Sequence, residues 1–212
     1  MQQTIDIKAL IIAAHAAISN HVDELTALDA AIGDGDHGIN MKRGLDAVLA
    51  EADSISAMSL NDALGAAGTR LVMTVGGASG PLFATFLMVF GRELGAKTTY
   101  DAQIVANAFA AAVDAVAKRG KARQGEKTLL DVLFPLSNAL NVRRNCVELA
   151  AIARAAALAT IPIQARKGRA AYLGKRSIGH MDPGAHSVSL IMTAVSEVIG
   201  VKTVSKIMAG SL

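Results

Sequence analysis

Apolar side chains recur every three or four positions over long parts of the chain. In the first such stretch they are Leu10, Ala14, Ile18, Val22, Leu25 and Leu28. This spacing predicts one long amphipathic helix that buries a single face. The same period returns near residues 104–116 and 188–198, and predicts further helices there.

Polar and glycine-rich breaks divide the chain into about eight helices. The breaks fall at residues 33–38, 53–59, 76–81, 95–99, 120–125, 141–145 and 161–184. Short connections make successive helices antiparallel neighbours, as in an up-and-down bundle. No low-complexity linker and no internal repeat is visible, so we expect an all-α fold and a single domain over residues 1–212.

Composition supports the helical prediction. Hydrophobic residues make up 52% of the 212 residues but aromatic residues only 3%, which nearly excludes an all-β fold. Cys146 is the only cysteine, so no internal disulfide can form. Asp6 and Lys8 interrupt the start of the chain, where a signal peptide would need an apolar core. We therefore expect a cytoplasmic protein.

Charge and hydropathy argue against two classes of partner. The net charge is only +3, and the basic residues gather in two loops, whereas nucleic-acid readers usually interleave basic residues with stacking aromatic residues, so nucleic-acid binding is not expected. Residues 71–91 carry no charge over a length that could span a bilayer. Glycines and a proline at 76–81 would break a spanning helix, so we interpret this stretch as two buried helices and expect no membrane span.

Three carboxylates lie close together at residues 28–38. Asp29 ends a predicted helix, where the helix dipole disfavours a negative charge, and Asp34 and Asp36 follow in a glycine-rich turn. An ordinary surface turn is one interpretation. The other is a Mg²⁺ site, because this hard ion takes carboxylate oxygens together with substrate phosphates. Three carboxylates exceed the usual requirement of one such ion, so we expect two Mg²⁺ ions.

Residues 76–81 read Gly-Gly-Ala-Ser-Gly-Pro. Ser79 is the expected N-cap of the following helix, and the glycines let backbone N–H groups approach an anion closely. The alternative is a tight turn that needs glycine only for its backbone angles.

Two basic loops are also candidates for phosphate binding. Residues 118–128 resemble a Walker A loop but have one residue too many and no preceding strand, so they fail as a P-loop. They form either a solvated loop or a phosphate-attracting one. Residues 161–184 contain five basic residues before any acidic one, and form either a phosphate-binding loop or a disordered segment. The histidines lack the spacing of a zinc site.

Four motifs occur together in order: GDGDHG at 33–38, GGASGP at 76–81, GEKTLLD at 125–131, and ARKGRA with DPG between 165 and 184. In this combination, residues 5–199 resemble the nucleotide-binding L subunit of dihydroxyacetone kinase. The resemblance implies an eight-helix antiparallel barrel with ADP or ATP bound at one end. It implies that Asp29, Asp34 and Asp36 hold two Mg²⁺ ions. The nucleotide-binding residues that it implies are His37, Gly38, Asn40, Gly77, Ala78, Ser79, Gly120, Leu129, Arg176, Asp182, Pro183 and Gly184.

The resemblance also implies partners. In this family a separate K subunit holds dihydroxyacetone, and in one form a phosphohistidine-carrying phosphotransferase protein rephosphorylates the bound ADP. A homodimer is a further expectation. Two alternatives stay open: an ATP-dependent kinase for a related ketose such as a tetrulose, and a non-catalytic nucleotide-binding module that regulates a partner.

Overall fold

The computed structural model describes residues 5–97 and 99–209, and every element in this part of the chain is a helix. The elements are α1 (Ile7–Ser19), α2 (Val22–Ile32), α3 (His37–Ala50), α4 (Ala52–Ser56), α5 (Leu60–Thr74), α6 (Ser79–Leu94), α7 (Ala102–Gly120), α8 (Leu130–Asn141), α9 (Cys146–Leu158), the 3-10 helix η1 (Arg169–Ser177) and α10 (Pro183–Ala209). The all-α prediction is therefore confirmed, but the exact number of eight helices is not.

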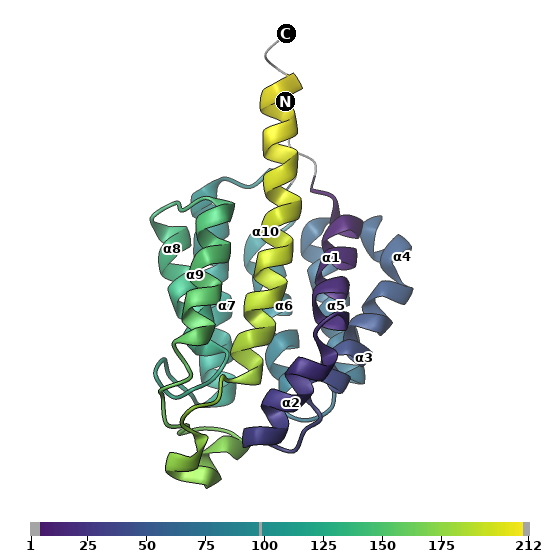
Figure 1. Cartoon of the computed structure of the whole chain (residues 1–212). Helices are drawn as coiled ribbons and strands as arrows, with labels where there is room; N and C mark the ends of the chain where they lie inside the picture. The colour runs from purple at the N-terminus through teal and green to yellow at the C-terminus, as the bar shows by residue number, and fades with distance from the viewer. Residues whose placement is uncertain (1–4, 98, 210–212) are drawn as a thin grey trace.

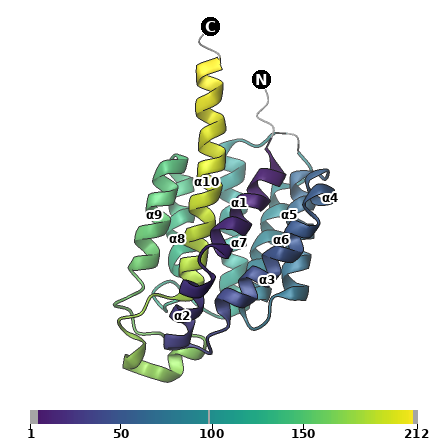
Figure 2. The ribbon, with the colours of Figure 1, turned by 45° about the vertical axis from the view of Figure 1, so that its right-hand side comes forward.

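The longer helices pack side by side in a ring. Contacts run from α1 through α3, α5, α6, α7, α8 and α9 to α10, which returns to α1 and closes the ring. Successive members of the ring run up and down (Figures 1 and 2). The helices α2 and α4 and the 3-10 helix η1 are additions to this ring, and these three account for the difference from the predicted number.

The core has two main parts. One is built mainly by α1, α3 and α5 around Ile18, Met41 and Leu71, and the other mainly by α7, α8 and α9 around Val116, Leu136 and Ala153. Many side chains in both parts are small, so the helices lie close together. The apolar periodicity of the sequence therefore marks the faces that the helices bury.

The long helix predicted for residues 10–28 is wrong in one respect, because it is two helices. The chain breaks at Asn20 and His21, between α1 and α2. The His21 ring nitrogen Nδ1 lies 2.7 Å from the carbonyl oxygen of Ala17, where it caps the end of α1. The apolar period continues across the break, which is why periodicity alone did not reveal it.

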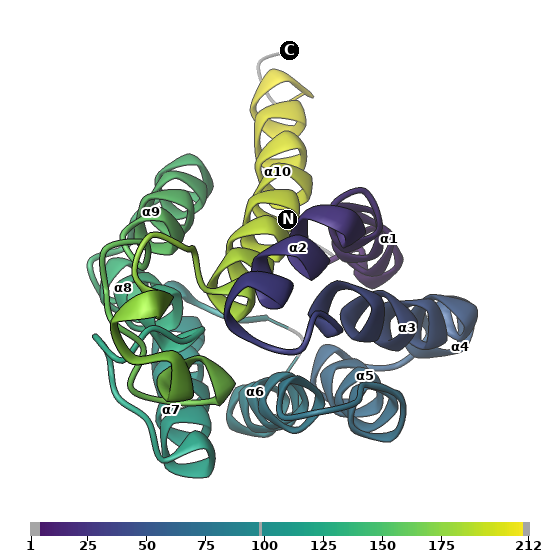
Figure 3. The same cartoon turned by 60° about the horizontal axis from the view of Figure 1, so that its bottom comes forward.

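Residues 71–91 form the end of α5, a turn and most of α6, so the two helices joined by a glycine turn are confirmed. The prediction that both are buried is wrong in part, because Val72 is 41% exposed and Met73 is 69% exposed. In the described part of the chain, no helix combines the length and the hydropathy that crossing a membrane requires. The turn between the two helices lies at the same end of the ring as α2, η1 and the first residues of α10 (Figure 3). The motifs of the sequence thus gather at one end of the bundle.

Candidate metal and nucleotide site

The three carboxylates predicted as metal ligands meet at this end. Asp29 lies in the last turn of α2, and Asp34 and Asp36 lie in the loop before α3. One oxygen from each carboxylate can be chosen so that all three atoms lie within 4.8 Å of one another. A single small cation can therefore reach all three.

Glycine allows the Asp29 carboxylate to occupy its position. A Cβ atom at Gly33 would lie 2.1 Å from Asp29 Oδ1, closer than any real contact. The other oxygen, Oδ2, accepts hydrogen bonds from the backbone N–H groups of Asp36 at 2.9 Å and His37 at 3.2 Å. The loop thus wraps around one carboxylate and orients it.

The donor set fits a hard divalent cation. All three side chains offer only oxygen, and the Asp29 carboxylate lies at the negative end of the α2 dipole, where a cation is favourable. Arg169 of η1 forms an ion pair with Asp34 from across the loop. The guanidinium of Arg169 thus places a positive charge beside the three carboxylates.

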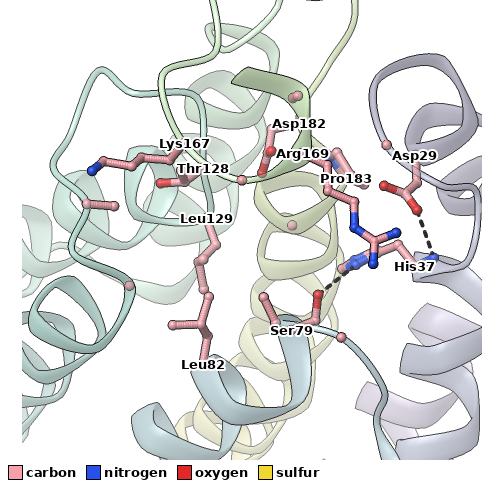
Figure 4. Close-up of a pocket in the computed structure, with 18 of the residues that line it drawn as sticks. Asp29, His37, Ser79, Leu82, Thr128, Leu129, Lys167, Arg169, Asp182 and Pro183 are labelled. Carbon is pink, nitrogen blue, oxygen red and sulfur yellow. Dashed lines mark hydrogen bonds between the residues drawn. The ribbon is translucent and has the colours of Figure 1, made fainter. Parts of the chain in front are cut away.

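His37 connects three helices beneath the carboxylates. Its Nδ1 lies 3.1 Å from the Ser79 hydroxyl at the start of α6 (Figure 4). Its Nε2 lies 2.8 Å from the Ser187 hydroxyl of α10. Burial lowers the pKa of His37, although the negative charges of Asp29 and Asp36 oppose this. The ring is neutral at pH 7, so one nitrogen donates and the other accepts.

The glycine turn at 76–80 faces the carboxylates. Gly77 has a φ of +67°, and a Cβ at Gly80 would lie 2.5 Å from the carbonyl oxygen of Val75. Ser79 is not the N-cap that the sequence predicted, because Ala78 holds that position and Ser79 is the first residue of α6. The Ser79 hydroxyl contacts His37 instead.

These elements border a cavity of about 460 Å³. Its apolar wall contains Leu82, Val116, Ala122 and Leu129. Leu82 and Leu129 lie on the side of the cavity away from Asp29 (Figure 4). The cavity therefore has an acidic end, a turn with backbone N–H groups, and an apolar end, and its volume is within the range of small-molecule sites.

The apolar wall is held by a buried ammonium group. Lys127 is 1% exposed, and its Nζ donates to the carbonyl oxygens of Thr160 at 2.8 Å, Ile163 at 3.2 Å and His180. Asp131 accepts from the backbone N–H of Thr128 at 2.8 Å. Lys127 is thus a structural residue, which corrects the interpretation of 118–128 as a wholly solvated or phosphate-attracting loop.

Asp182 begins α10 at the edge of the cavity. Its Oδ2 accepts from the backbone N–H of Ala185 at 2.7 Å. The pKa of Asp182 is raised to about 7, mainly by burial and to a smaller extent by the nearby Asp131 and Asp29, while the N–H of Ala185 and the ammonium of Lys127 lower it. A cation at the carboxylates would favour the ionised form.

The cavity wall includes most of the residues predicted to bind metal or nucleotide. They are Asp29, Asp34, Asp36, His37, Gly77, Ala78, Ser79, Gly120, Leu129, Asp182, Pro183 and Gly184. Gly38, Asn40 and Arg176 are not in this wall. A Cβ at Gly38 would lie 2.2 Å from the carbonyl oxygen of Val22, so Gly38 allows α3 to pack on α2. The side chain of Asn40 is next to Gly76, where a Cβ would lie 3.3 Å from Asn40 Oδ1. Arg176 is exposed on η1.

Other residues of the wall were not predicted from the sequence. Leu82 and Val116 have the helical period of core residues, so nothing distinguished them. The ARKGRA motif marked Arg169 as a candidate in the sequence, but its ion pair with Asp34 could not be predicted because it depends on the fold. Lys127 also belongs to a motif, and its burial could not be inferred from a charged loop.

The fold and the site together define a class of protein: an all-helical bundle in which three converging carboxylates face a glycine turn across one cavity. The chain belongs to the DAK2 domain family, which matches residues 31–197.

Curated relatives of the chain are kinases and kinase subunits. The ADP-binding subunit DhaL of the PEP-dependent dihydroxyacetone kinase of Escherichia coli is 42% identical over 182 residues, which cover 82% of this chain and 87% of that subunit. The L-erythrulose kinase of Pectobacterium atrosepticum is 36% identical over 214 residues, which cover 94% of this chain but only 35% of that enzyme.

Solved structures show the same fold. The dihydroxyacetone kinase from C. freundii in complex with AMP-PNP and Mg²⁺ aligns with a TM-score of 0.71 and 25% identity, over 93% of this chain and 34% of that one. Its native form aligns with a TM-score of 0.74 and 24% identity. The chain therefore spans about a third of the length of that kinase.

Proposed function

We propose that this chain is the nucleotide-binding phosphotransfer subunit of a dihydroxyacetone kinase, organised as one domain over residues 1–212. It binds ADP or ATP through two Mg²⁺ ions held by Asp29, Asp34 and Asp36. It passes a phosphoryl group to dihydroxyacetone on a partner K subunit. The observation that carries the proposal is the meeting of these carboxylates with the 76–80 turn across one cavity.

Each part of the cavity suits one part of a nucleotide. The apolar wall around Leu82 and Leu129 suits a base, and the N-terminus of α6 suits a phosphate. Mg²⁺ at the carboxylates would offset the negative charge of the phosphates and of the group in transfer. The chain itself positions these groups, since Gly33 makes room for Asp29 and neutral His37 fixes the start of α6.

Neither the three carboxylates nor His37 is placed as a general base for an acceptor. Asp29, Asp34 and Asp36 are the proposed ligands, and both nitrogens of His37 are engaged by serine hydroxyls. A partner that supplies both the acceptor and its base agrees with this arrangement. We therefore assign the role of supplying the acceptor and its base to the K subunit. We expect this chain to be located in the cytoplasm.

The phosphoryl donor defines two forms of this function. The similarity to a PEP-dependent kinase subunit supports a phosphohistidine-carrying phosphotransferase protein that rephosphorylates bound ADP. The similarity to an L-erythrulose kinase over 94% of the chain favours a second candidate, an ATP-dependent kinase for a related ketose. A retained ADP that added ATP does not exchange supports the first, and rapid exchange supports the second.

Asp34→Ala tests the site. The purified variant should lose bound ADP and should not support dihydroxyacetone phosphorylation when mixed with the K subunit and the phosphotransferase proteins. Asp114→Ala is the matched control, because Asp114 is an exposed carboxylate on α7 outside the cavity wall. Full ADP retention and full activity in Asp34→Ala would overturn the metal assignment.

A further inference from the structure

The charges of the chain are distributed very unevenly. Residues 118–127 and 161–180 contain ten of its 21 Lys and Arg residues but only one of its 18 Asp and Glu residues. The rest of the chain is consequently acidic, although the net charge is +3. Positive charge is thus concentrated in two segments.

The two segments lie together on one side of the cavity. The backbone N–H of Arg166 donates to the carbonyl oxygen of Glu126 at 3.1 Å, and Lys127 joins the first segment to the carbonyl oxygens of Thr160 and His180. Both segments also contribute to the cavity wall, through Gly120 and Gly168. They therefore form one continuous surface at the rim.

Six exposed basic side chains of these segments lie outside the cavity wall, and we call them the basic collar: Lys118, Lys121, Arg123, Arg166, Lys175 and Arg176. Within the part of the chain that the structure describes, none of the six forms an ion pair. Lys8, Lys42 and Arg70, by contrast, each pair with a carboxylate. The collar therefore presents uncompensated positive charge.

An exposed aromatic side chain stands within the collar. Tyr172 of η1 is 90% exposed, while Leu173, one residue later, packs against Ile32 and Ala170. Tyrosine and arginine are enriched among the residues that contribute most to protein–protein binding. An exposed tyrosine among unpaired cations is typical of a protein interface.

We propose that the basic collar and Tyr172 dock the acidic face of the protein that holds the phosphoryl acceptor. This inference rests on the proposed function, because it requires a partner that brings its acceptor to the cavity mouth. The collar would steer an acidic surface toward the mouth and fix its orientation. Tyr172 would supply buried contact area at the centre of the interface.

Two other ligands fit the collar less well. A nucleotide in the cavity is not in reach of all six side chains, because they lie outside the wall. A single-stranded nucleic acid requires several stacking aromatic rings, and Tyr172 is the only aromatic residue in either segment. An acidic protein surface fits both the charge and the lone tyrosine.

The test measures binding to the K subunit of the same organism. The double variant Arg123→Glu and Lys175→Glu should weaken binding at least tenfold at low ionic strength, and should flatten its salt dependence. Tyr172→Ala should weaken binding by a similar factor with the salt dependence kept. Neither substitution touches the cavity wall, so bound ADP should be unchanged.

The matched control is Lys97→Glu with Arg143→Glu, which changes the net charge equally. Both residues are exposed and lie at the helix connections of the opposite end of the bundle. This control should bind the K subunit as the unaltered chain does. Equal weakening by the control would show a general charge effect and would overturn the docking assignment.

The remaining outcomes separate the two proposals. If the unaltered chain binds the K subunit and both collar variants bind it equally well, the collar inference fails and the proposed function stands. If the unaltered chain retains ADP but neither binds nor activates the K subunit, the proposed function fails and the inference fails with it. Tighter binding of a DNA oligonucleotide than of the K subunit, lost in the double variant, would assign the collar to nucleic acid instead.

Discussion

At the scale of the residue, the position of the Asp29 carboxylate depends on the absence of a neighbouring side chain. Gly33 has a negative φ of −142°, so a positive φ is not what requires glycine there. The requirement is space, because the Asp29 carboxylate occupies the place of the missing Cβ. A proposed metal ligand is thus positioned by a residue that offers no ligand atom.

Gly33→Ala should therefore weaken the Mg²⁺-dependent binding of ADP by at least about tenfold, which corresponds to roughly 1.4 kcal/mol. The added methyl group would displace Asp29 Oδ1, which lies 2.1 Å from its position. Titration calorimetry with ADP in Mg²⁺ measures the effect. Gly65→Ala is the control, because a Cβ at Gly65 meets no atom within 4 Å. The control should keep its affinity and gain about 0.5–1 kcal/mol of stability.

The raised pKa of Asp182 predicts that the stability of the protein depends on pH. Its pKa of about 7 lies above the ordinary value of 3.8 that applies to the unfolded chain, so the folded protein binds the proton more tightly. The contribution to stability is complete below pH 4 and is lost as the pH rises through 7. The loss is at most about 4 kcal/mol.

The measurement compares the unfolding free energy of the original chain and of Asp182→Asn between pH 4 and pH 8, without metal or nucleotide. Relative to the variant, the original chain should lose stability as the pH rises. This difference isolates Asp182 from His37 and His186, whose burial lowers their pKa values and whose effect has the opposite sign. Parallel curves would contradict the assigned protonation of Asp182.

Site residues were predictable from the sequence where the type of side chain and its spacing along the chain point to the same kind of site. Asp29, Asp34 and Asp36 were predicted to share a site because three carboxylates without a nearby cation need an explanation, and their oxygens do converge. Their proposed cation remains a prediction. Gly38 was predicted as a ligand-binding glycine, yet the space it leaves is filled by α2. A glycine in a motif does not reveal which neighbour requires it.

At the scale of the element, the segment between α9 and α10 is held by polar contacts. The buried Ser177 hydroxyl accepts from the N–H of Ala165 at 2.9 Å and donates to the carbonyl oxygen of Gly174 at 2.6 Å. The N–H of Gly179 donates to the carbonyl oxygen of Ile161 at 2.9 Å. These hydrogen bonds explain why the segment between α9 and α10 folds with so few large apolar residues.

Lys127→Met should loosen this segment. The substitution keeps much of the side-chain volume but leaves the carbonyl oxygens of Thr160, Ile163 and His180 without their shared donor. Each buried unpaired carbonyl costs about 1–3 kcal/mol, so the chain should lose at least about 2 kcal/mol of stability. Hydrogen exchange should show faster exchange at the N–H groups of Arg166 and Gly179.

Lys121→Met is the matched control for this prediction. Lys121 belongs to the same loop and also has a positive φ, but its side chain is exposed. It should change neither stability nor exchange by a comparable amount. Equal effects of the two substitutions would show that the loop charge matters and the buried hydrogen bonds do not.

Helix breaks were predictable where glycine, proline or a run of polar residues interrupts the apolar period. The turn between α5 and α6 was predicted from its glycines, and the break between α1 and α2 was missed because Asn20 and His21 do not interrupt the apolar period. The 161–184 stretch was left open between order and disorder, because side-chain hydrogen bonds to the backbone have no sequence period. Local patterns thus predict the ring helices better than their polar connections.

At the scale of the whole molecule, up-and-down connectivity explains why the motifs meet. Helices that alternate in direction bring every second connection to the same end, so the segments before α3, α6, α8 and α10 become neighbours (Figure 3). The sequence predicted this arrangement of motifs only through a family resemblance. Spacing along a chain does not determine which ends of helices meet.

The most direct test of the account is a calorimetric titration of nucleotide-free protein with ADP, carried out in Mg²⁺ and again in EDTA. The account predicts one ADP per chain in Mg²⁺, with two Mg²⁺ ions bound at saturation, and no measurable binding in EDTA. It also predicts no binding in Mg²⁺ when Asp29, Asp34 and Asp36 are replaced by Asn. ADP affinity that is the same in EDTA, or that survives the triple substitution, would contradict the claim that these carboxylates hold the nucleotide through metal.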